Sequence, residues 1–182
     1  MNFKMASIVS GALLIGSAMT GIHAADLKVE LNKVSKEGAG ESIGSVTFRD
    51  SSELGLLIIP DLKGLSPGAH GFHVHENPDC GPGTKNGKTV PAGAAGGHYA
   101  PENTGKHAGP AGEGHLGDMP ALLVGPDGTA NMAMFAPRLQ VPDLVGRSVV
   151  VHEGGDNYSD KPKPLGGGGE RVACGVIAVD AI

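Results

Sequence analysis

Short runs of alternating apolar and polar residues, separated by glycine and proline turns, most constrain the fold of this chain. In most of these runs the alternation has a period of two, which is the pattern of a β-strand with one buried face. We find no convincing amphipathic helical pattern beside them. About eight strands of this kind predict an all-β protein, an eight-stranded antiparallel Greek-key barrel or sandwich. The runs are residues 27–32, 42–48, 54–59, 69–75, 121–124, 130–135, 148–152 and 171–179.

The connections between these runs are of two kinds. Pro60 is expected to end the third strand, and Pro126-Asp127-Gly128 is a tight-turn signal that predicts a hairpin between 121–124 and 130–135. The stretches 77–117 and 154–169 are instead long, rich in glycine and proline, and without apolar periodicity. A loop this long in a compact domain is normally functional or disordered. We expect two functional loops, the first ordered by a disulfide and a metal.

Residues 1–24 have the features of a secretory signal peptide. Lys4 is the sole charged residue before Asp26, an apolar stretch covers 6–19, and residues 22–24 resemble a cleavage site. The stretch is too short for a stable membrane span. We therefore expect one mature domain, 25–182, with no stable membrane insertion. Its 13 basic and 19 acidic residues give a net charge of −6, which argues against nucleic-acid binding.

The chain has two cysteines, Cys80 and Cys174. In an exported chain an even number of cysteines favours a disulfide, because export removes the protein from reducing conditions. Two separate buried thiols are the alternative.

A His-x-His pair stands at the centre of the fourth run. His73 and His75 alternate with Phe72 and Val74, and on a strand the side chains at i and i+2 point to the same face. Both imidazoles could then reach one metal ion. A pair of surface histidines on a half-exposed strand is the alternative interpretation. His70 is three positions from His73, on the opposite face of a continuous strand, and we expect it to form structural hydrogen bonds.

The number of histidines favours a metal site. Imidazole suits zinc, copper, iron and nickel. Three imidazoles with one carboxylate form a closed tetrahedral zinc site, whereas four imidazoles suit a tetragonal Cu(II) site. Asp118 adds a carboxylate three residues after His115. Once the signal is removed, seven histidines remain: His70, His73, His75, His98, His107, His115 and His152.

Several separated motifs together resemble the bacterial periplasmic copper,zinc superoxide dismutases. The resemblance spans about residues 27–177, and any one motif alone is weak. The motifs are Gly-Phe-His-Val-His-Glu at 71–76, Ala-Ala-Gly-Gly-His-Tyr at 94–99, Gly-Lys-His at 105–107, Gly-His-Leu-Gly-Asp at 114–118, Val-His-Glu at 151–153, Gly-Gly-Asp-Asn-Tyr-Ser-Asp at 154–160 and Gly-Glu-Arg-Val-Ala-Cys-Gly-Val-Ile at 169–177.

The resemblance implies one copper and one zinc per subunit and a role for each site residue. It implies that His98 bridges the two metals and protonates on its copper side, that Asp156 orients one ligand of each metal, and that Arg171 is the cation beside copper. It pairs Cys80 with Cys174. The implied copper ligands are His73, His75, His98 and His152, and the implied zinc ligands are His98, His107, His115 and Asp118.

The implied activity is superoxide dismutation in the periplasm. Two superoxide anions and protons become O2 and hydrogen peroxide by alternating reduction and oxidation of copper, with structural zinc, which protects the cell envelope. The resemblance permits a homodimer as well as a monomer. A metal carrier without turnover is the main alternative, and Arg171 argues against it. A zinc hydrolase is disfavoured, since Asp118 closes the zinc site. The candidate lysines for steering the anion are Lys85, Lys88, Lys106, Lys161 and Lys163, each of which could equally be an ordinary solvated loop residue.

Overall fold

The computed structural model describes residues 26–181, so the predicted signal peptide lies outside the described residues. The regular structure of the described chain consists of strands and short 3-10 helices. These are β1 (Leu27–Ser35), β2 (Gly38–Ser51), β3 (Gly55–Leu62), β4 (Gly68–His70), β5 (Phe72–His75), β6 (Gly83–Lys85), β7 (Lys88–Val90), η1 (Gly93–Ala95), β8 (Leu122–Val124), β9 (Met134–Ala136), η2 (Val141–Leu144), β10 (Arg147–His152), η3 (Leu165–Gly167) and β11 (Arg171–Ile177).

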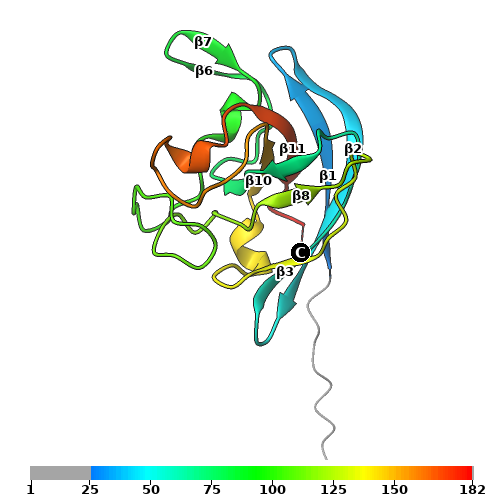
Figure 1. Ribbon diagram of the computed structural model, residues 1–182, viewed down its shortest axis with the longest axis vertical. Helices are drawn as coiled ribbons and strands as arrows, with labels where there is room; N and C mark the ends of the chain where they lie inside the picture. The colour runs from blue at the N-terminus through cyan, green and yellow to red at the C-terminus, as the bar shows by residue number, and fades with distance from the viewer. Residues whose placement is uncertain (1–25, 182) are drawn as a thin grey trace, which may run out of the picture.

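One curled antiparallel sheet dominates the molecule. Its strand order is β5-β10-β11-β1-β2-β3-β9, and β4 pairs with β8 in a separate two-stranded sheet. Strand β11 returns beside β1, next to the consecutive strands β1, β2 and β3, which is the order of a Greek key. The loops before β8 (green) and before β11 (orange) lie together on one side of the sheet (Figure 1). The prediction of an antiparallel all-β fold is confirmed.

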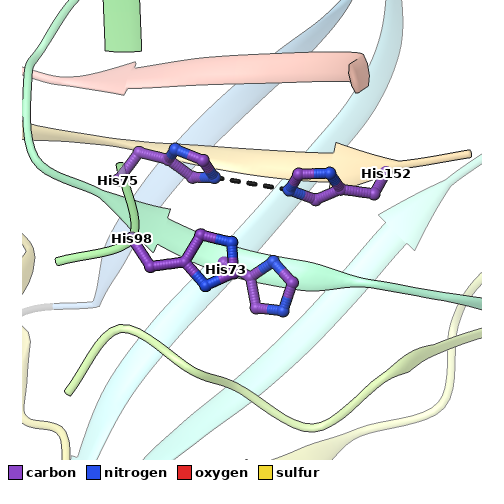
Figure 2. Close-up of side chains that lie close together, drawn as sticks. All are labelled: His73, His75, His98 and His152. Atoms are coloured by element: carbon purple, nitrogen blue, oxygen red, sulfur yellow. Dashed lines mark hydrogen bonds between the residues drawn. The ribbon is translucent and has the colours of Figure 1, made fainter. Parts of the chain in front are cut away.

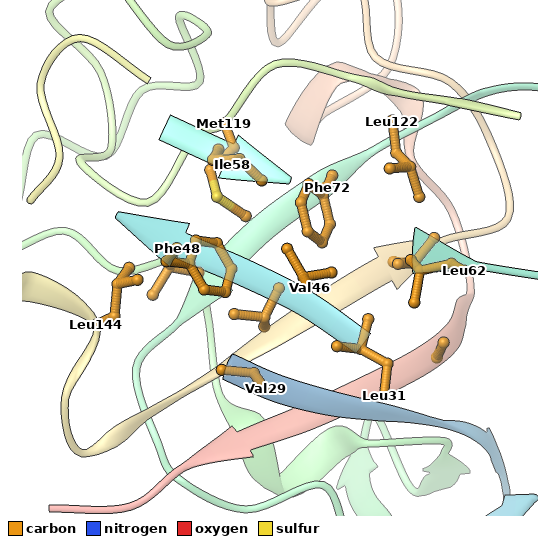
Figure 3. Packing of buried hydrophobic residues seen from close by; sticks show 14 of the residues in the cluster. Val29, Leu31, Val46, Phe48, Ile58, Leu62, Phe72, Met119, Leu122 and Leu144 are labelled. Carbon is orange, nitrogen blue, oxygen red and sulfur yellow. The ribbon is translucent and has the colours of Figure 1, made fainter. Parts of the chain in front are cut away.

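The core fills the concave side of this sheet. In β1, Leu27, Val29 and Leu31 are buried and the residues between them are exposed, as a period of two requires. Phe48 and Phe72, from β2 and β5, are fully buried in the same cluster (Figure 3). Because the chain has no tryptophan, this core consists mainly of aliphatic side chains.

The prediction that Pro60 ends the third strand is wrong. Strand β3 continues to Leu62, and Pro60 is paired with Val46 of β2. The ladder with β9 covers Leu56 to Ile58 alone. The side of β3 opposite β2 is therefore open at Pro60, and proline is tolerated where a strand has such an open edge.

The predicted hairpin around Asp127 is also wrong, although its turn is present. Gly125 and Thr129 are hydrogen-bonded across the turn. Strand β8 nevertheless pairs with β4, and β9 pairs with β3. The local sequence signal predicted the turn correctly. It did not predict the strand partners, which lie far away in the chain.

The first long loop contains structure that its composition did not predict. Strands β6 and β7 form a small hairpin, and η1 follows it. The predicted disulfide is present: Cys80 is bonded to Cys174, with a Cα–Cα distance of 5.7 Å. The bond attaches this loop to β11, beside a small apolar cluster that includes Ala95 and Val150.

Candidate metal centre

Two neighbouring strands supply three of the predicted ligands. Strand β5 carries His73 and His75, and β10 ends at His152. The register pairs β5 with β10, which brings the three imidazoles close to one another. All three are buried. The break between β4 and β5 falls at Gly71, where a Cβ would lie 3.1 Å from the His73 ring. A larger residue there would therefore press against a candidate ligand.

The first long loop runs back along β5 and adds two more ligands. Isolated bridges join His75 to His98 and His73 to Asp118. Between them, Gly117 is wedged against β5, and a Cβ on Gly117 would lie 2.3 Å from the Val74 carbonyl oxygen. The backbone of the loop thereby places one imidazole and one carboxylate directly beside the histidine strand.

Four imidazoles form a tight group (Figure 2). One nitrogen from each of His73, His75, His98 and His152 lies within 4.8 Å of the other three. His75 Nδ1 lies 3.0 Å from the Gly96 carbonyl, and His75 Nε2 faces His152 Nε2 at 3.3 Å. Since a carbonyl can only accept, His75 Nδ1 carries the proton and its Nε2 lone pair points into the group.

Asp156, from the second long loop, joins this group to the neighbouring one. Its Oδ2 accepts a hydrogen bond from His73 Nε2 at 2.8 Å, and its Oδ1 accepts one from His107 Nε2 at 2.7 Å. His73 therefore keeps Nδ1 free for a metal, whereas His107 turns its Nδ1 toward Asp118. A carboxylate in this position fixes the tautomer and the orientation of the rings.

The second group has a carboxylate at its centre. Asp118 Oδ1 lies 2.8 Å from His98 Nδ1, and Asp118 Oδ2 lies 2.9 Å from His107 Nδ1. A close set of possible ligand atoms includes these three residues and His73. His115 lies beside this set, with Nδ1 3.4 Å from Asp118 Oδ1. Three of the four ligands predicted for zinc thus belong to this set, and His115 lies beside it.

The donor atoms fit metal ions. His73 Nδ1, His98 Nε2 and His115 Nδ1 are buried without a hydrogen-bond partner. An unpaired buried nitrogen costs about 1–3 kcal/mol, so three of them clustered in one place need an explanation. Four converging imidazoles are a donor set for copper, and three imidazoles with one carboxylate are a donor set for tetrahedral zinc.

Burial and charge set the protonation of these groups in the metal-free protein. Burial lowers the pKa of His73 and His75 well below the ordinary value, and it lowers the pKa of His152 to about 3. The pKa of His98 is lowered for the same reason. These imidazoles are neutral at pH 7, so their lone pairs are available to a metal. Burial also opposes charge on His107, but Asp118 and Asp156 outweigh it and raise the pKa of His107 to about 9.

The metal-free protein should therefore be most stable near pH 6.5. Below that pH the unfolded chain binds protons that the four buried imidazoles of the folded chain do not bind. The free energy of unfolding then falls by up to about 1.4 kcal/mol per pH unit for each histidine. His107 acts oppositely: its contribution is complete below pH 6.5 and is lost as the pH rises through 9. Urea unfolding of metal-free protein from pH 5 to 9 measures this curve, and a stability that rises from pH 6.5 to pH 5 would contradict it.

Arg171 lies at the start of β11 beside the four-imidazole group. Its guanidinium donates to the carbonyls of Ala92 and Gly96. Burial is the main cause of the lowered pKa of His75 and His152, and the charge of Arg171 adds to it. Burial lowers the pKa of Arg171, but a guanidinium stays charged at any working pH. The disulfide-linked loop thus fixes a cation beside the candidate copper ligands.

A cavity of about 670 Å³ leads from the surface to Arg171, His98 and His152. Of the five lysines predicted as steering candidates, Lys85 and Lys88 line it. Lys106 lines a different cavity. Lys161 and Lys163 are not among the residues that line the cavity of about 670 Å³. Sequence reasoning missed Lys36, which also lines it from the turn between β1 and β2. No local signal could have placed that turn at the cavity.

His70 forms structural hydrogen bonds, as predicted. Its Nδ1 lies 2.7 Å from the His152 carbonyl oxygen and its Nε2 lies 2.8 Å from the Ser66 carbonyl oxygen. It therefore supports the backbone of a candidate ligand and belongs to neither group of ligand atoms.

Comparison with known proteins gives one consistent result. A family model described as copper/zinc superoxide dismutase matches residues 42–177. The Cu-Zn superoxide dismutase of Escherichia coli K12 is 56% identical over 167 residues, which cover 91% of this chain and 96% of that protein. The Cu-Zn superoxide dismutase 1 of Salmonella typhimurium LT2 is 54% identical over 179 residues, with 97% and 99% covered.

Solved structures agree. The Cu/Zn superoxide dismutase from Brucella abortus superposes with a TM-score of 0.82 at 50% identity, over 84% of this chain and 99% of that one. The monomeric copper, zinc superoxide dismutase from Salmonella enterica gives a TM-score of 0.74 at 54% identity, with the same coverage.

Proposed function

The chain belongs to the copper/zinc superoxide dismutase family, and from this premise we propose that its two groups of ligands bind one copper and one zinc for the dismutation of superoxide. The protein is an oxidoreductase that converts two superoxide anions and two protons into O2 and hydrogen peroxide. The observation that carries the proposed site is His98, whose single ring belongs to both sets of ligand atoms: its Nδ1 lies 2.8 Å from Asp118 Oδ1 and its Nε2 has no hydrogen-bond partner.

The copper site in this proposal consists of His73, His75, His98 and His152. Copper supplies the one-electron oxidation and reduction that the reaction requires. Two features of the chain support the ligand set: the four imidazoles are neutral at pH 7, and the contacts of His73 with Asp156 and of His75 with Gly96 leave one inward-facing nitrogen on each ring.

The zinc site consists of His98, His107, His115 and Asp118. Zinc does not change its oxidation state, so at this site it would order the first long loop and set the basicity of the His98 ring. Asp156 couples the two sites, because it holds one ring of each. A shift of the second long loop would therefore affect both metals at once.

The chain itself supplies charge and a proton. Arg171 attracts the superoxide anion to the floor of the cavity, where the net charge of the whole chain would otherwise repel it. His98 Nε2, which is buried without a hydrogen-bond partner, would hold a proton for the reduced product. The experiment that tests the function is superoxide decay with protein containing one copper and one zinc per chain. A fully loaded protein with no effect on the decay would make it a metal carrier.

Lys85 and Lys88 are proposed to steer superoxide into the cavity. Lys85→Glu should lower kcat/KM several-fold at low ionic strength, since steering by a local field is worth about 10–10³ in rate. The difference from the parent should shrink as salt is added. Lys106→Glu changes the net charge equally but lies at another cavity, so it is the matched control. Equal losses in both variants, or none in either, would contradict local steering.

The cellular location and the oligomeric state of this protein are proposed from its relatives and its N-terminal sequence. The relatives are bacterial, and we expect this chain to be exported to the periplasm after cleavage near residue 24. No helix among residues 26–181 is long and apolar enough to cross a membrane. Cell fractionation and the mass of the mature protein test the location. A homodimer stays a prediction, and sedimentation velocity distinguishes one copy from two.

A further inference from the structure

One arginine outside both ligand groups is hydrogen-bonded to the backbone of the loop that carries His115. Arg138 lies between β9 and η2, and its guanidinium donates to three carbonyls of the segment 112–115. Nη1 donates to Gly112 and, at 3.4 Å, to His115, and Nη2 donates to Gly114 at 3.1 Å. A planar guanidinium presents its donors in a fixed fork. It can therefore set the position of a short irregular segment more closely than a single hydrogen bond could.

The other side of the same segment is packed against the chain around His107. A Cβ on Gly112 would lie 2.3 Å from the Ala108 carbonyl oxygen, and a Cβ on Gly114 would lie 2.7 Å from the Lys106 carbonyl oxygen. The backbone N–H of His115 donates to that Lys106 carbonyl at 2.9 Å. Segment 112–115 is thus held on one side by the Arg138 guanidinium and on the other by residues 106–108 of the first long loop.

His115 is the proposed zinc ligand whose position depends most on these contacts. Its ring is 11% exposed, whereas the side chains of His107 and Asp118 are fully buried. Its Nδ1 has no hydrogen-bond partner. Its ring has no hydrogen bond of the kind that Asp156 makes with His107, and Asp118 Oδ1 lies 3.4 Å from its Nδ1, so within the described residues the backbone does most of the positioning.

We propose that Arg138 is a positioning residue for the zinc site, which holds segment 112–115 so that His115 closes the coordination of zinc. The proposal rests on the assignment of His115 as a zinc ligand. Groups that orient metal ligands from outside the coordination shell are typically worth about 10–100-fold in metal affinity. The direct effect should fall on zinc, because no copper ligand lies in segment 112–115, and copper should respond only through the shared ring of His98.

The test compares Arg138→Gln, Arg138→Lys and the parent chain for zinc affinity, by competition with a chromophoric chelator at a temperature well below unfolding. Arg138→Gln should raise the zinc Kd by about 10–100-fold. Arg138→Lys keeps the charge but loses the planar fork of donors, so its zinc Kd should lie between those of Arg138→Gln and the parent chain. The visible spectrum of Co(II) placed in the zinc site should lose its tetrahedral character in Arg138→Gln. The Cu(II) EPR spectrum, recorded with enough zinc to fill the zinc site, should be unchanged. Arg49→Gln is the control, as Arg49 is an exposed arginine paired with Asp26.

An unchanged zinc Kd and Co(II) spectrum in Arg138→Gln would overturn the proposal, even if the metal-free variant melted at a lower temperature. His115→Ala separates this failure from that of the ligand assignment. If His115→Ala weakens zinc binding and Arg138→Gln does not, the inference about Arg138 alone is wrong. If neither variant weakens it, His115 is not a zinc ligand.

Discussion

Protein that contains zinc but no copper should leave the decay of superoxide at its uncatalysed rate. The reaction needs a centre that gains and loses one electron, and zinc has no second oxidation state for this. The side chains around the site supply charge, orientation and a proton, but none of them supplies that electron. Adding one equivalent of copper should restore rapid decay, and this is the largest change in activity that we expect. Pulse radiolysis or stopped-flow measurement of superoxide follows it directly.

Two comparisons make this prediction specific to the site. His152→Ala removes one of the four proposed copper ligands and leaves the proposed zinc ligands in place, so it should lower copper affinity and activity while zinc stays bound. His23→Ala, in the predicted signal peptide, changes a histidine outside both proposed ligand sets and should leave the activity unchanged. Catalytic decay by the zinc-only sample, at a rate matching the copper-loaded one, would contradict the proposed role of copper.

Replacing both cysteines, as in Cys80→Ala with Cys174→Ala, should produce the largest loss of stability. The disulfide joins residues 94 positions apart. In the chain-entropy model, a cross-link that closes a loop of this length stabilises by about 4–5 kcal/mol, which is an upper figure. Urea unfolding of metal-free protein measures the loss. Activity should fall as well, because the tethered loop supplies the Ala92 and Gly96 carbonyls that hold Arg171.

Val34→Ala is the matched control for the disulfide. Val34 packs against the same small apolar cluster as Cys80, so this variant loosens the packing and keeps the cross-link. It should lose clearly less stability than the double variant and should leave Arg171 in place. If the two variants lost the same free energy of unfolding, packing around the sulfur atoms would account for the effect and the cross-link would not.

The strands were predictable because their signal is local. A period of two in residues such as Leu27, Val29 and Leu31 reports which face of a strand is buried, whatever its partner is. The boundaries and pairings were less predictable. Pro60 lies inside β3 because one side of that strand is open there, and the strands flanking Asp127 separate because each pairs elsewhere. Both outcomes depend on residues far along the chain.

The candidate site divides in the same way. The family motifs named every proposed ligand, since a metal restricts the residue types at its ligand positions to a few. They did not name Arg138 or Lys36, whose roles come from where the fold brings them. Neither lies in a motif, and a single arginine or lysine in a loop has no local pattern that distinguishes a positioning or steering residue from a solvated one.

The sequence by itself determined the all-β class, the pairing of the two cysteines and the chemical identity of the metal donors. Each follows from a short-range pattern, a count or a recognisable motif. The tertiary structure alone decided that His98 lies between two ligand groups, that Asp156 spans them, and which cations reach the cavity and the zinc loop. Those relations are distances between groups that are up to about 80 residues apart in the chain, and such distances are set by strand pairing and loop packing, which local residue patterns do not encode.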